Sequence, residues 1–453
     1  MSIHGRKHCV TAATRPSAAV QRGVTSAHVG LSLPVAFGYG VAAMRALTLI
    51  RRGLVLTSPR AAPEAADLLT GGGRVLAVSP PGGLDAYACV PHVTDVDAQG
   101  LTVLPGLIDA HVHLAGGGGE AGFRTRVPRR MLSDLVSAGV TSAIGVLGTD
   151  GVTRTMRELV ATALGLREEG LSAWCFTGNY AVPVVTLTGS VRDDLVFCDP
   201  VIGVGELAIS DHRSSQPTLD ELLRVASDAY VAGLTAGKAG LLHLHLGDGA
   251  RGLGLLRQAL EVAEIPARVY QPTHLNRNGR LFAEAKALCA ARAAERLPQP
   301  WYDFTAFPPE DCDGDTLSAA DAVLDWWRAG LPLDCVTVSS DGGGCLPVFD
   351  AHGCMTRMGV GRSTTLLETL QALVAGGMPL AEAAALMTAG PAKALMLPHK
   401  GRLATEADAD LIMLDPELRL RAVMARGRFL MRDGALLPSG RGVFEREHEK
   451  ENP

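Results

Sequence analysis

Apolar runs alternate with amphipathic stretches through the middle of the chain. Eight of these runs have the length of strands, and they end at His113, Leu147, Gly178, Ser210, Leu246, Leu275, Phe307 and Ser340. Between them, apolar positions recur at helical spacing in residues 128–138, 154–169, 219–232, 254–263 and 281–296. This alternation predicts an α/β fold, a (β/α)8 barrel of the TIM type, in which reactive groups collect at the carboxyl ends of the strands.

Shorter alternating segments flank this middle region. Residues 47–56, 74–78 and 102–104 precede it, and residues 410–414, 422–425 and 428–431 follow it. They predict antiparallel strands of one small β-sandwich built from both ends of the chain. The predicted domains are therefore a sandwich of residues 44–105 plus 399–441 and a catalytic barrel of residues 106–398.

The two ends of the chain have a different composition. Residues 1–43 contain no Asp or Glu and show no sustained period, which predicts a disordered N-terminal extension. A targeting segment is the alternative for this stretch. Residues 442–453 form a polar tail.

Composition narrows the class of protein. A net charge of -5 over 453 residues leaves no basic surplus to neutralise phosphates, so nucleic acid is not an expected partner. No apolar run reaches the roughly 18 to 20 residues needed to cross a bilayer, so no membrane association is expected. The nine cysteines contain no Cys-x-x-Cys pair, which favours reduced thiols and a cytoplasmic location.

The first strand of the predicted barrel carries a His-x-His pair. His111 and His113 end the apolar run, and in an extended strand residues two apart point to one face. Both imidazoles can therefore reach one metal ion. Without a metal, four buried ring nitrogens would have to be satisfied by hydrogen bonds.

Further metal-ligand types stand at other strand ends. The fourth strand carries Glu206, the fifth His243 and His245, the sixth ends at His274, and the eighth at Asp341. Each has an ordinary alternative alone, because a histidine can be a satisfied core residue and Asp341 can cap a turn. Together they predict a site for two metal ions bridged by a carboxylate.

These residues resemble the binuclear amidohydrolase superfamily, and longer motifs resemble its isoaspartyl dipeptidase family. The motifs are GGGGEAG at 116–122, LGTD at 147–150, TGNY at 177–180, ISDHRS at 209–214 and HLNRN at 274–278. The resemblance extends over residues 44–441. It implies hydrolysis of the β-aspartyl bond of small isoaspartyl dipeptides by a metal-bridged hydroxide, and a homo-oligomer, up to an octamer.

The resemblance also implies roles for particular residues. The ligands of two divalent ions, Zn²⁺ by expectation, would be His111, His113, Glu206, His245, His274 and Asp341. Asp341 would also accept the proton of the attacking water, and Tyr180 would stabilise the oxyanion; a core tyrosine is the alternative. The substrate contacts would be Gly118, Glu120, Thr149, Tyr180, Arg213, Arg277 and Cys345.

The charges of a β-aspartyl dipeptide match the implied substrate contacts. A β-aspartyl dipeptide has a free ammonium, which Glu120 would bind, and carboxylates, which Arg213 and Arg277 would grip in bidentate fashion. Gly118 and Thr149 would add smaller polar contacts. A surface ion pair is the alternative for either arginine.

Two positions depart from the family pattern. Well-known members bridge their metals with a carbamylated lysine, whereas this chain has Glu206 and one extra residue before the ISDHRS motif. Glutamate is shorter by ~3 to 4 Å, so the backbone must approach the metals, and a bulge at Gly205 would allow this. A carbamylated lysine is not expected, because Lys238 lies at the opposite end of the barrel. Cys345 stands where a substrate-binding serine is usual, and a thiol is a weaker donor.

Two other functions remain open. Another amidohydrolase, acting on cyclic amides or N-acyl amino acids, would keep the metals and lose the set of Glu120, Arg213 and Arg277. A non-catalytic scaffold would lose metal ligands.

Overall fold

The computed structural model describes residues 47–312, 315–349 and 355–448. The predicted N-terminal extension of residues 1–43 lies outside this part. No helix within it combines the length and the apolar character needed to cross a membrane. Residues 443–448 of the predicted polar tail form helix α11 (Val443–His448).

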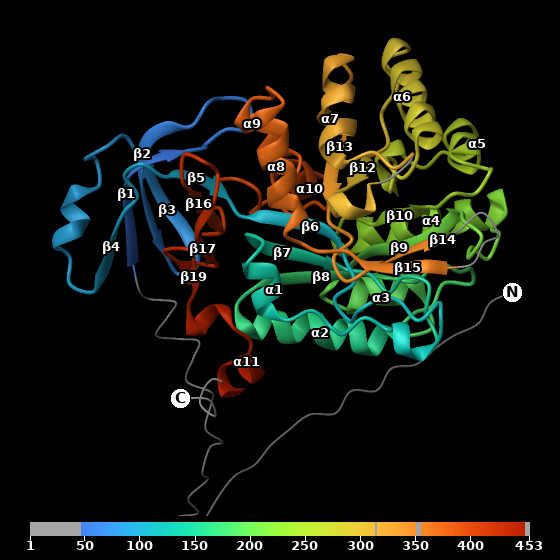
Figure 1. Ribbon diagram of the computed structural model, residues 1–453, viewed down its shortest axis with the longest axis horizontal. Coiled ribbons are helices and arrows are strands. Elements are labelled where there is room, and N and C mark those ends of the chain that lie inside the picture. Colours follow the sequence, from blue (N-terminus) through green and yellow to red (C-terminus); the bar gives the residue numbers. More distant parts are fainter. Residues whose placement is uncertain (1–46, 313–314, 350–354, 449–453) are drawn as a thin grey trace, which may run out of the picture. The chain divides into compact units, whose positions relative to one another are not determined.

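Both flanks of the chain enter one nine-stranded sheet (Figure 1). Its strands are β1 (Leu47–Val55), β2 (Glu64–Gly71), β3 (Arg74–Ser79), β4 (Val93–Asp97), β5 (Thr102–Pro105), β16 (Leu411–Leu414), β17 (Leu420–Ala425), β18 (Arg428–Arg432) and β19 (Ala435–Leu436). Their order is β19-β18-β17-β16-β5-β1-β2-β3, with β4 on β1. Antiparallel pairing of β5 with β16 joins the two flanks.

The prediction of purely antiparallel strands is wrong for this sheet. Strand β1 pairs in parallel with both β4 and β5. Long connections between these strands, including the 3₁₀ turn Asp85–Cys89, let the chain return in the same direction. Strands β2 and β4 are not predicted from the pattern, because the last six residues of β2 are all buried and β4 is short and acidic.

Eight parallel strands form the middle region. They are β6 (Leu107–Val112), β7 (Val140–Gly145), β8 (Ser172–Thr177), β9 (Val201–Ser210), β10 (Leu241–Leu246), β11 (Tyr270–Thr273), β12 (Tyr302–Thr305) and β13 (Val336–Ser339). The first six form one sheet in chain order, and β12 pairs with β13. A bridge between Val112 and Gly342 brings the end of β13 back to β6. Every strand ends within two residues of its predicted end.

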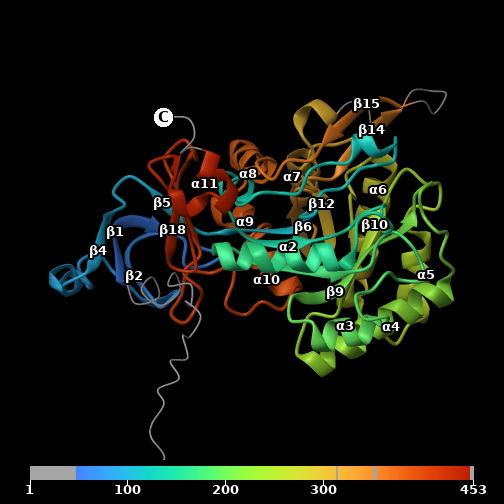
Figure 2. The ribbon, with the colours of Figure 1, turned by 90° about the horizontal axis from the view of Figure 1, so that it is seen from below.

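Helices lie outside these strands (Figure 2). They are α1 (Leu132–Val136), α2 (Met156–Glu169), α3 (Val191–Phe197), α4 (Leu219–Ala236), α5 (Gly254–Val262), α6 (Gly279–Ala294), α7 (Ala319–Arg328), α8 (Thr365–Ala375), α9 (Leu380–Ala385) and α10 (Ala389–Ala394). Local signals set their ends: Thr218 and Glu221 form a capping box at α4, which stops at Gly237 in the left-handed region. The hairpin of β14 (Cys345–Phe349) and β15 (Met355–Val360) follows β13.

Candidate metal centre

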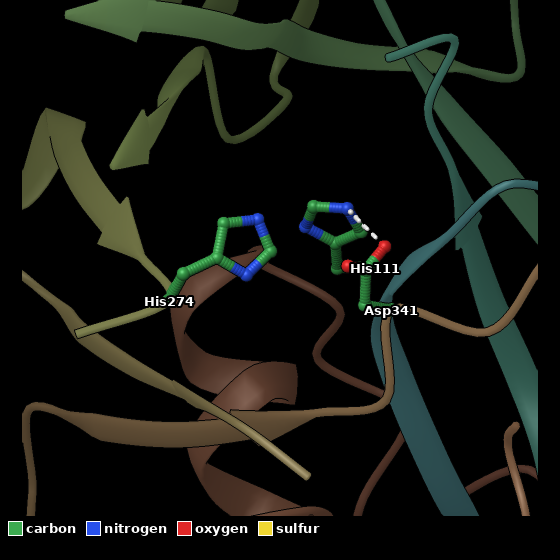
Figure 3. A group of neighbouring side chains, drawn as sticks. All are labelled: His111, His274 and Asp341. Atoms are coloured by element: carbon green, nitrogen blue, oxygen red, sulfur yellow. Dashed lines mark ion pairs between the residues drawn. The ribbon is translucent and has the colours of Figure 1, made fainter. Parts of the chain in front are cut away.

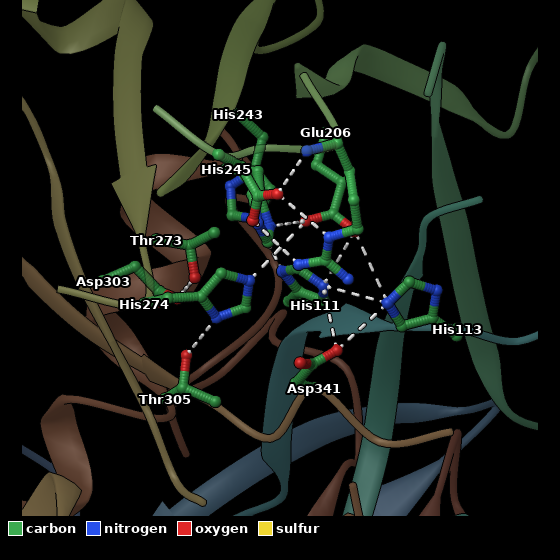
Figure 4. A network of polar contacts seen from close by, with 12 residues as sticks. His111, His113, Glu206, His243, His245, Thr273, His274, Asp303, Thr305 and Asp341 are labelled. Atoms are coloured by element: carbon green, nitrogen blue, oxygen red, sulfur yellow. Dashed lines mark hydrogen bonds and ion pairs between the residues drawn. The ribbon is translucent and has the colours of Figure 1, made fainter. Parts of the chain in front are cut away.

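Six side chains converge at the carboxyl ends of the parallel strands (Figure 4). Strand β6 carries His111, with His113 just beyond it, and β9 and β10 carry Glu206 and His245. His274 and Asp341 follow β11 and β13. None is more than 5% exposed. All six predicted metal ligands are thus brought together in one buried cluster.

Glu206 lies between two pairs of histidines. Its Oε1 is 3.6 Å from His111 Nε2 and 3.5 Å from His113 Nε2. Its Oε2 is 3.1 Å from His245 Nδ1 and 3.6 Å from His274 Nε2. Each oxygen therefore faces its own pair, which is the arrangement of a carboxylate that bridges two cations.

Asp341 closes the cluster on one side. Its Oδ1 lies 3.3 Å from His111 Nε2 and 3.0 Å from His113 Nε2. Figure 3 shows Asp341 beside His111, with His274 facing them. Three overlapping groups have ligand atoms close enough to hold an ion: His111, His113 and Glu206; Glu206, His245 and His274; and His111, His274 and Asp341.

The donor set fits divalent cations. Among the described residues, Glu206 Oε1 and Asp341 Oδ1 have no hydrogen-bond partner although both atoms are buried. By contrast, the neighbouring buried carboxylate of Asp303 accepts hydrogen bonds from Thr273, Thr337 and Ser339. Buried carboxylate oxygens without donors are costly, and a cation would offset that cost.

The protonation states of the two carboxylates and of His274 agree with this fit. For His111, burial lowers the pKa, but the facing carboxylates of Glu206 and Asp341 outweigh it and hold the pKa well above its usual range. Burial raises the pKa of Glu206, but the facing His111 and hydrogen bonds from the surrounding imidazoles hold it well below its usual range. Burial also opposes the charge of Asp341, whose pKa is lowered by His111 and His113. Burial lowers the pKa of His274 to about 3, so this imidazole is neutral. Ionised carboxylates and neutral imidazoles are the forms that bind metals.

A bulge brings Glu206 to the centre. Leu242 on β10 pairs with Val204 on β9, whereas Leu244 pairs with Leu207, so β9 has one extra residue in this interval. A Cβ atom at Gly205 would lie 2.7 Å from His243 Cβ. The bulge expected from the inserted residue is therefore present, and it requires glycine at that position.

Two polar residues behind the ligands are not among the six predicted metal ligands. His243 Nε2 lies 2.8 Å from His111 Nδ1, and its Nδ1 lies 3.0 Å from Gln271 Oε1, so it is a hydrogen-bonded neighbour of the cluster. Asp211 Oδ2 lies 2.9 Å from His245 Nε2. In the sequence, His243 could have been noticed as part of the second His-x-His pair, and Asp211 as part of the ISDHRS motif.

Four predicted substrate residues gather next to the cluster. Arg213 Nη1 lies 3.4 Å from Glu120 Oε1, and the Cys345 thiol donates to Glu120 Oε2 at 2.9 Å. The Arg213 guanidinium lies 5.4 Å from the centre of the Tyr180 ring. That ring packs 4.2 Å from the ring of His245, between centroids.

The other three predicted contacts, Gly118, Thr149 and Arg277, lie in the loops that follow β6, β7 and β11. The Arg277 guanidinium stands 5.7 Å from the Phe307 ring, which stacks on His274. Gly118 has a φ of +80° and lies in a loop bridged to Arg126. Half-buried Thr149 directly follows Gly148, where a Cβ atom would lie 2.5 Å from the His113 ring.

One detail differs from the expected substrate grip. Arg213 donates from Nε and Nη2 to the two oxygens of Asp211, at 3.0 and 2.8 Å. Its bidentate edge is therefore occupied inside the protein. Only the Nη1 side faces Glu120 and the mouth.

Comparisons with known proteins relate this chain to amidohydrolases. A family described as Amidohydrolase family matches residues 316–435. The chain is 40% identical to a crystallised beta-aspartyl dipeptidase of Fervidobacterium islandicum in complex with a beta-Asp-Leu dipeptide, with a TM-score of 0.79 over 87% of this chain and 98% of that one. It is 27% identical to the allantoinase of Deinococcus radiodurans over 81% of this chain and 86% of that protein. A dihydropyrimidinase of Brevibacillus agri, 16% identical, shares the fold at a TM-score of 0.60 over 86% of this chain and 96% of that one.

Proposed function

Because this chain belongs to the beta-aspartyl dipeptidase family of amidohydrolases, we propose that it hydrolyses the β-aspartyl bond of isoaspartyl dipeptides in a metal-dependent reaction. The observation that carries the proposal is the division of four histidines into two pairs by the oxygens of Glu206. Beside it, Glu120 and Arg213 supply one negative and one positive charge for a dipeptide, and the Cys345 thiol donates to Glu120.

Two divalent ions, held by the six clustered ligands, would supply activated water at neutral pH and polarise the amide carbonyl. Asp341 accepts the proton of the water and passes it to the departing amine. Tyr180 donates a hydrogen bond to the developing oxyanion. The mixed set of imidazoles and carboxylates favours Zn²⁺.

The substrate is bound by charge. Glu120 accepts the ammonium. Arg277, and Arg213 through Nη1, the side that faces Glu120, bind carboxylates. Gly118, Thr149 and Cys345 add smaller contacts. The relative from Fervidobacterium islandicum was crystallised with beta-Asp-Leu, which supports this substrate class.

The bridge is Glu206 itself, with no carbamylated lysine. In support, Lys238 Nζ donates to the carbonyl oxygens of Leu195, Cys198 and Val201. Val201 opens β9, at the end of that strand away from the metal cluster.

The proposal includes a closed (β/α)8 barrel of residues 106–398 and a β-sandwich of residues 44–105 plus 399–441. The eight parallel strands and the nine-stranded sheet support it. A homo-oligomer, up to an octamer, and a cytoplasmic location are predictions from the family resemblance and the cysteine pattern.

The decisive assay is hydrolysis of isoAsp-Leu against Asp-Leu with the metal-loaded protein. We expect cleavage of the β-linked dipeptide only, with about two ions per chain. Dihydroorotate, a hydantoin, allantoin and an N-acyl amino acid are the parallel substrates. Faster turnover of any of these would replace the proposed function with another amidohydrolase activity, and a protein without bound metal would be a scaffold.

A further inference from the structure

The carboxylate of Asp211 connects the metal cluster with the arginine beside it. Its side chain is 2% exposed and accepts from His245 and from Arg213 at the same time. It directly follows β9, and it is not itself one of the clustered metal ligands.

The contact with His245 fixes the orientation of that ring. Asp211 Oδ2 lies 2.9 Å from His245 Nε2, and an ionised carboxylate can only accept a hydrogen bond. His245 Nδ1 lies 3.1 Å from Glu206 Oε2, on the side of the metal cluster. When Nδ1 binds a metal, the one remaining proton of the ring sits on Nε2, where Asp211 accepts it. Asp211 therefore selects the tautomer that can bind a metal.

The contacts with Arg213 fix the guanidinium. The backbone N–H and Nε of Arg213 donate to Asp211 Oδ1 at 2.7 and 3.0 Å, and Nη2 donates to Oδ2 at 2.8 Å. These three bonds hold the plane of the guanidinium over the Tyr180 ring. They leave Nη1 directed toward Glu120.

The Asp211 carboxylate fits beside Gly247 only because that residue has no side chain. A Cβ atom at Gly247 would lie 2.0 Å from Asp211 Oδ2. Gly247 is buried and follows His245 by two residues, and its backbone N–H donates to the carbonyl oxygen of Ser210. Any larger residue at position 247 would displace Asp211 from both of its partners.

We propose that Asp211 is a positioning residue that sets His245 for the metal and Arg213 for the substrate carboxylate through one buried side chain. The metal part stands on the geometry alone, and the substrate part rests on the proposed function. It follows that a change at Asp211 damages metal affinity and substrate affinity together, whereas a change at Arg213 damages only the second.

Asp211→Asn is the direct test, because in either orientation its NH2 group replaces an oxygen that accepts from Arg213, and the neutral amide oxygen is a weaker acceptor for His245 than a carboxylate. We expect Zn²⁺ affinity, measured by competition with a chromophoric chelator, to fall about 10- to 100-fold. We also expect KM for isoAsp-Leu to rise at least about 10-fold, since Arg213 is no longer held. Asp325→Asn, which breaks an exposed ion pair with Lys286 on the outer helices, is the matched control and should change neither value.

Gly247→Ala keeps the Asp211 carboxylate and removes its space, so it should reproduce both effects. Gly254→Ala is its control, because no atom lies within 4 Å of the added methyl group. In an Arg213→Met background, Asp211→Asn should still lower Zn²⁺ affinity and should no longer raise KM. Thermal unfolding of the apo-proteins separates these effects from misfolding.

Zn²⁺ affinity and KM within twofold of wild type in both Asp211→Asn and Gly247→Ala would overturn the assignment. Equal KM effects of Asp211→Asn with and without Arg213 would overturn its substrate part. If the wild-type protein does not cleave isoAsp-Leu, the proposed function fails, while the Zn²⁺ measurements still decide the metal part.

Discussion

Strand β9 has a half-buried lysine near its first residue and the buried metal cluster toward its carboxyl end, and the two differ in how their polar atoms are hydrogen-bonded. Near its first residue, the Lys238 ammonium uses all three of its donors on the carbonyl oxygens of Leu195, Cys198 and Val201, at 2.7, 2.6 and 2.9 Å. In the metal cluster, within the described part of the chain, Glu206 Oε1 on β9 and Asp341 Oδ1 after β13 have no hydrogen-bond donor. Satisfied polar atoms stabilise a fold, and unsatisfied buried ones mark the place where a ligand supplies the missing partner.

The largest expected effect comes from removing the unsatisfied bridge. Glu206→Ala leaves no carboxylate between the two histidine pairs, so both ions should bind poorly and kcat should fall at least ~10³-fold. Elemental analysis and isoAsp-Leu turnover measure this. A variant that keeps two ions and its activity would show that Glu206 is not the bridge.

Metal reconstitution tests whether the bridge is Glu206 or a carbamylated lysine. A glutamate bridge needs only to be ionised, so apo-protein in degassed, bicarbonate-free buffer should regain full activity with metal alone. A strict requirement for bicarbonate, or a carbamate found by intact mass, would assign the bridge to a lysine.

Asp341→Asn should lower kcat about 10³-fold while most of the metal stays bound, because the amide can still ligate but cannot accept the proton of the water. Metal content and kcat measured on the same sample give the comparison. Near wild-type turnover would exclude Asp341 as the proton acceptor.

Tyr180→Phe should lower kcat about 10²-fold with a smaller change in KM, since the oxyanion forms only beyond the ground state. Steady-state kinetics with isoAsp-Leu separate the two constants. An unchanged kcat would leave Tyr180 as a packing partner of the His245 ring.

Glu120→Gln should raise KM for isoAsp-Leu about 10-fold, because the substrate ammonium loses its counter-charge. An N-acetylated substrate without that ammonium is the control and should be affected less. Equal losses with both substrates would contradict the assigned role.

Lys238→Met tests the satisfied end of β9 and should have the smallest effect on catalysis. It removes the Lys238 donor from three carbonyl oxygens, of which that of Cys198 keeps the backbone N–H of Val201, so the free energy of unfolding should fall by about 1 to 3 kcal/mol while kcat stays unchanged. Urea unfolding and isoAsp-Leu kinetics test both halves. A large loss of kcat in the folded variant would mean that the two ends of β9 are not independent.

Much of the fold follows from local patterns. Each parallel strand ends within two residues of the end predicted from its apolar run, because length and flanking polar residues are local properties. Strands β2 and β4 do not follow, since neither shows the alternation of a half-buried strand. The parallel pairing of β1 with β4 and β5 depends on how the chain returns, which no single segment encodes.

Part of the metal centre could also be predicted from local features of the sequence. The chain carries metal-ligand residues at the ends of five of the eight parallel strands, and a parallel fold must bring such ends to one edge. The inserted residue before ISDHRS likewise predicted the bulge at Gly205. Motif resemblance, and not spacing, suggested the roles of Glu120, Arg213 and Arg277.

The sequence by itself determined which residues could act and on which edge of the sheet they would meet. Only the tertiary structure decided that each oxygen of Glu206 faces its own histidine pair, that His243 hydrogen-bonds His111, and that Asp211 occupies the bidentate edge of Arg213. The physical reason is the distance along the chain between the residues that determine each feature. Side-chain direction and strand length are set by neighbours along the chain, whereas a hydrogen-bond partner is set by distances between strands that meet only after folding.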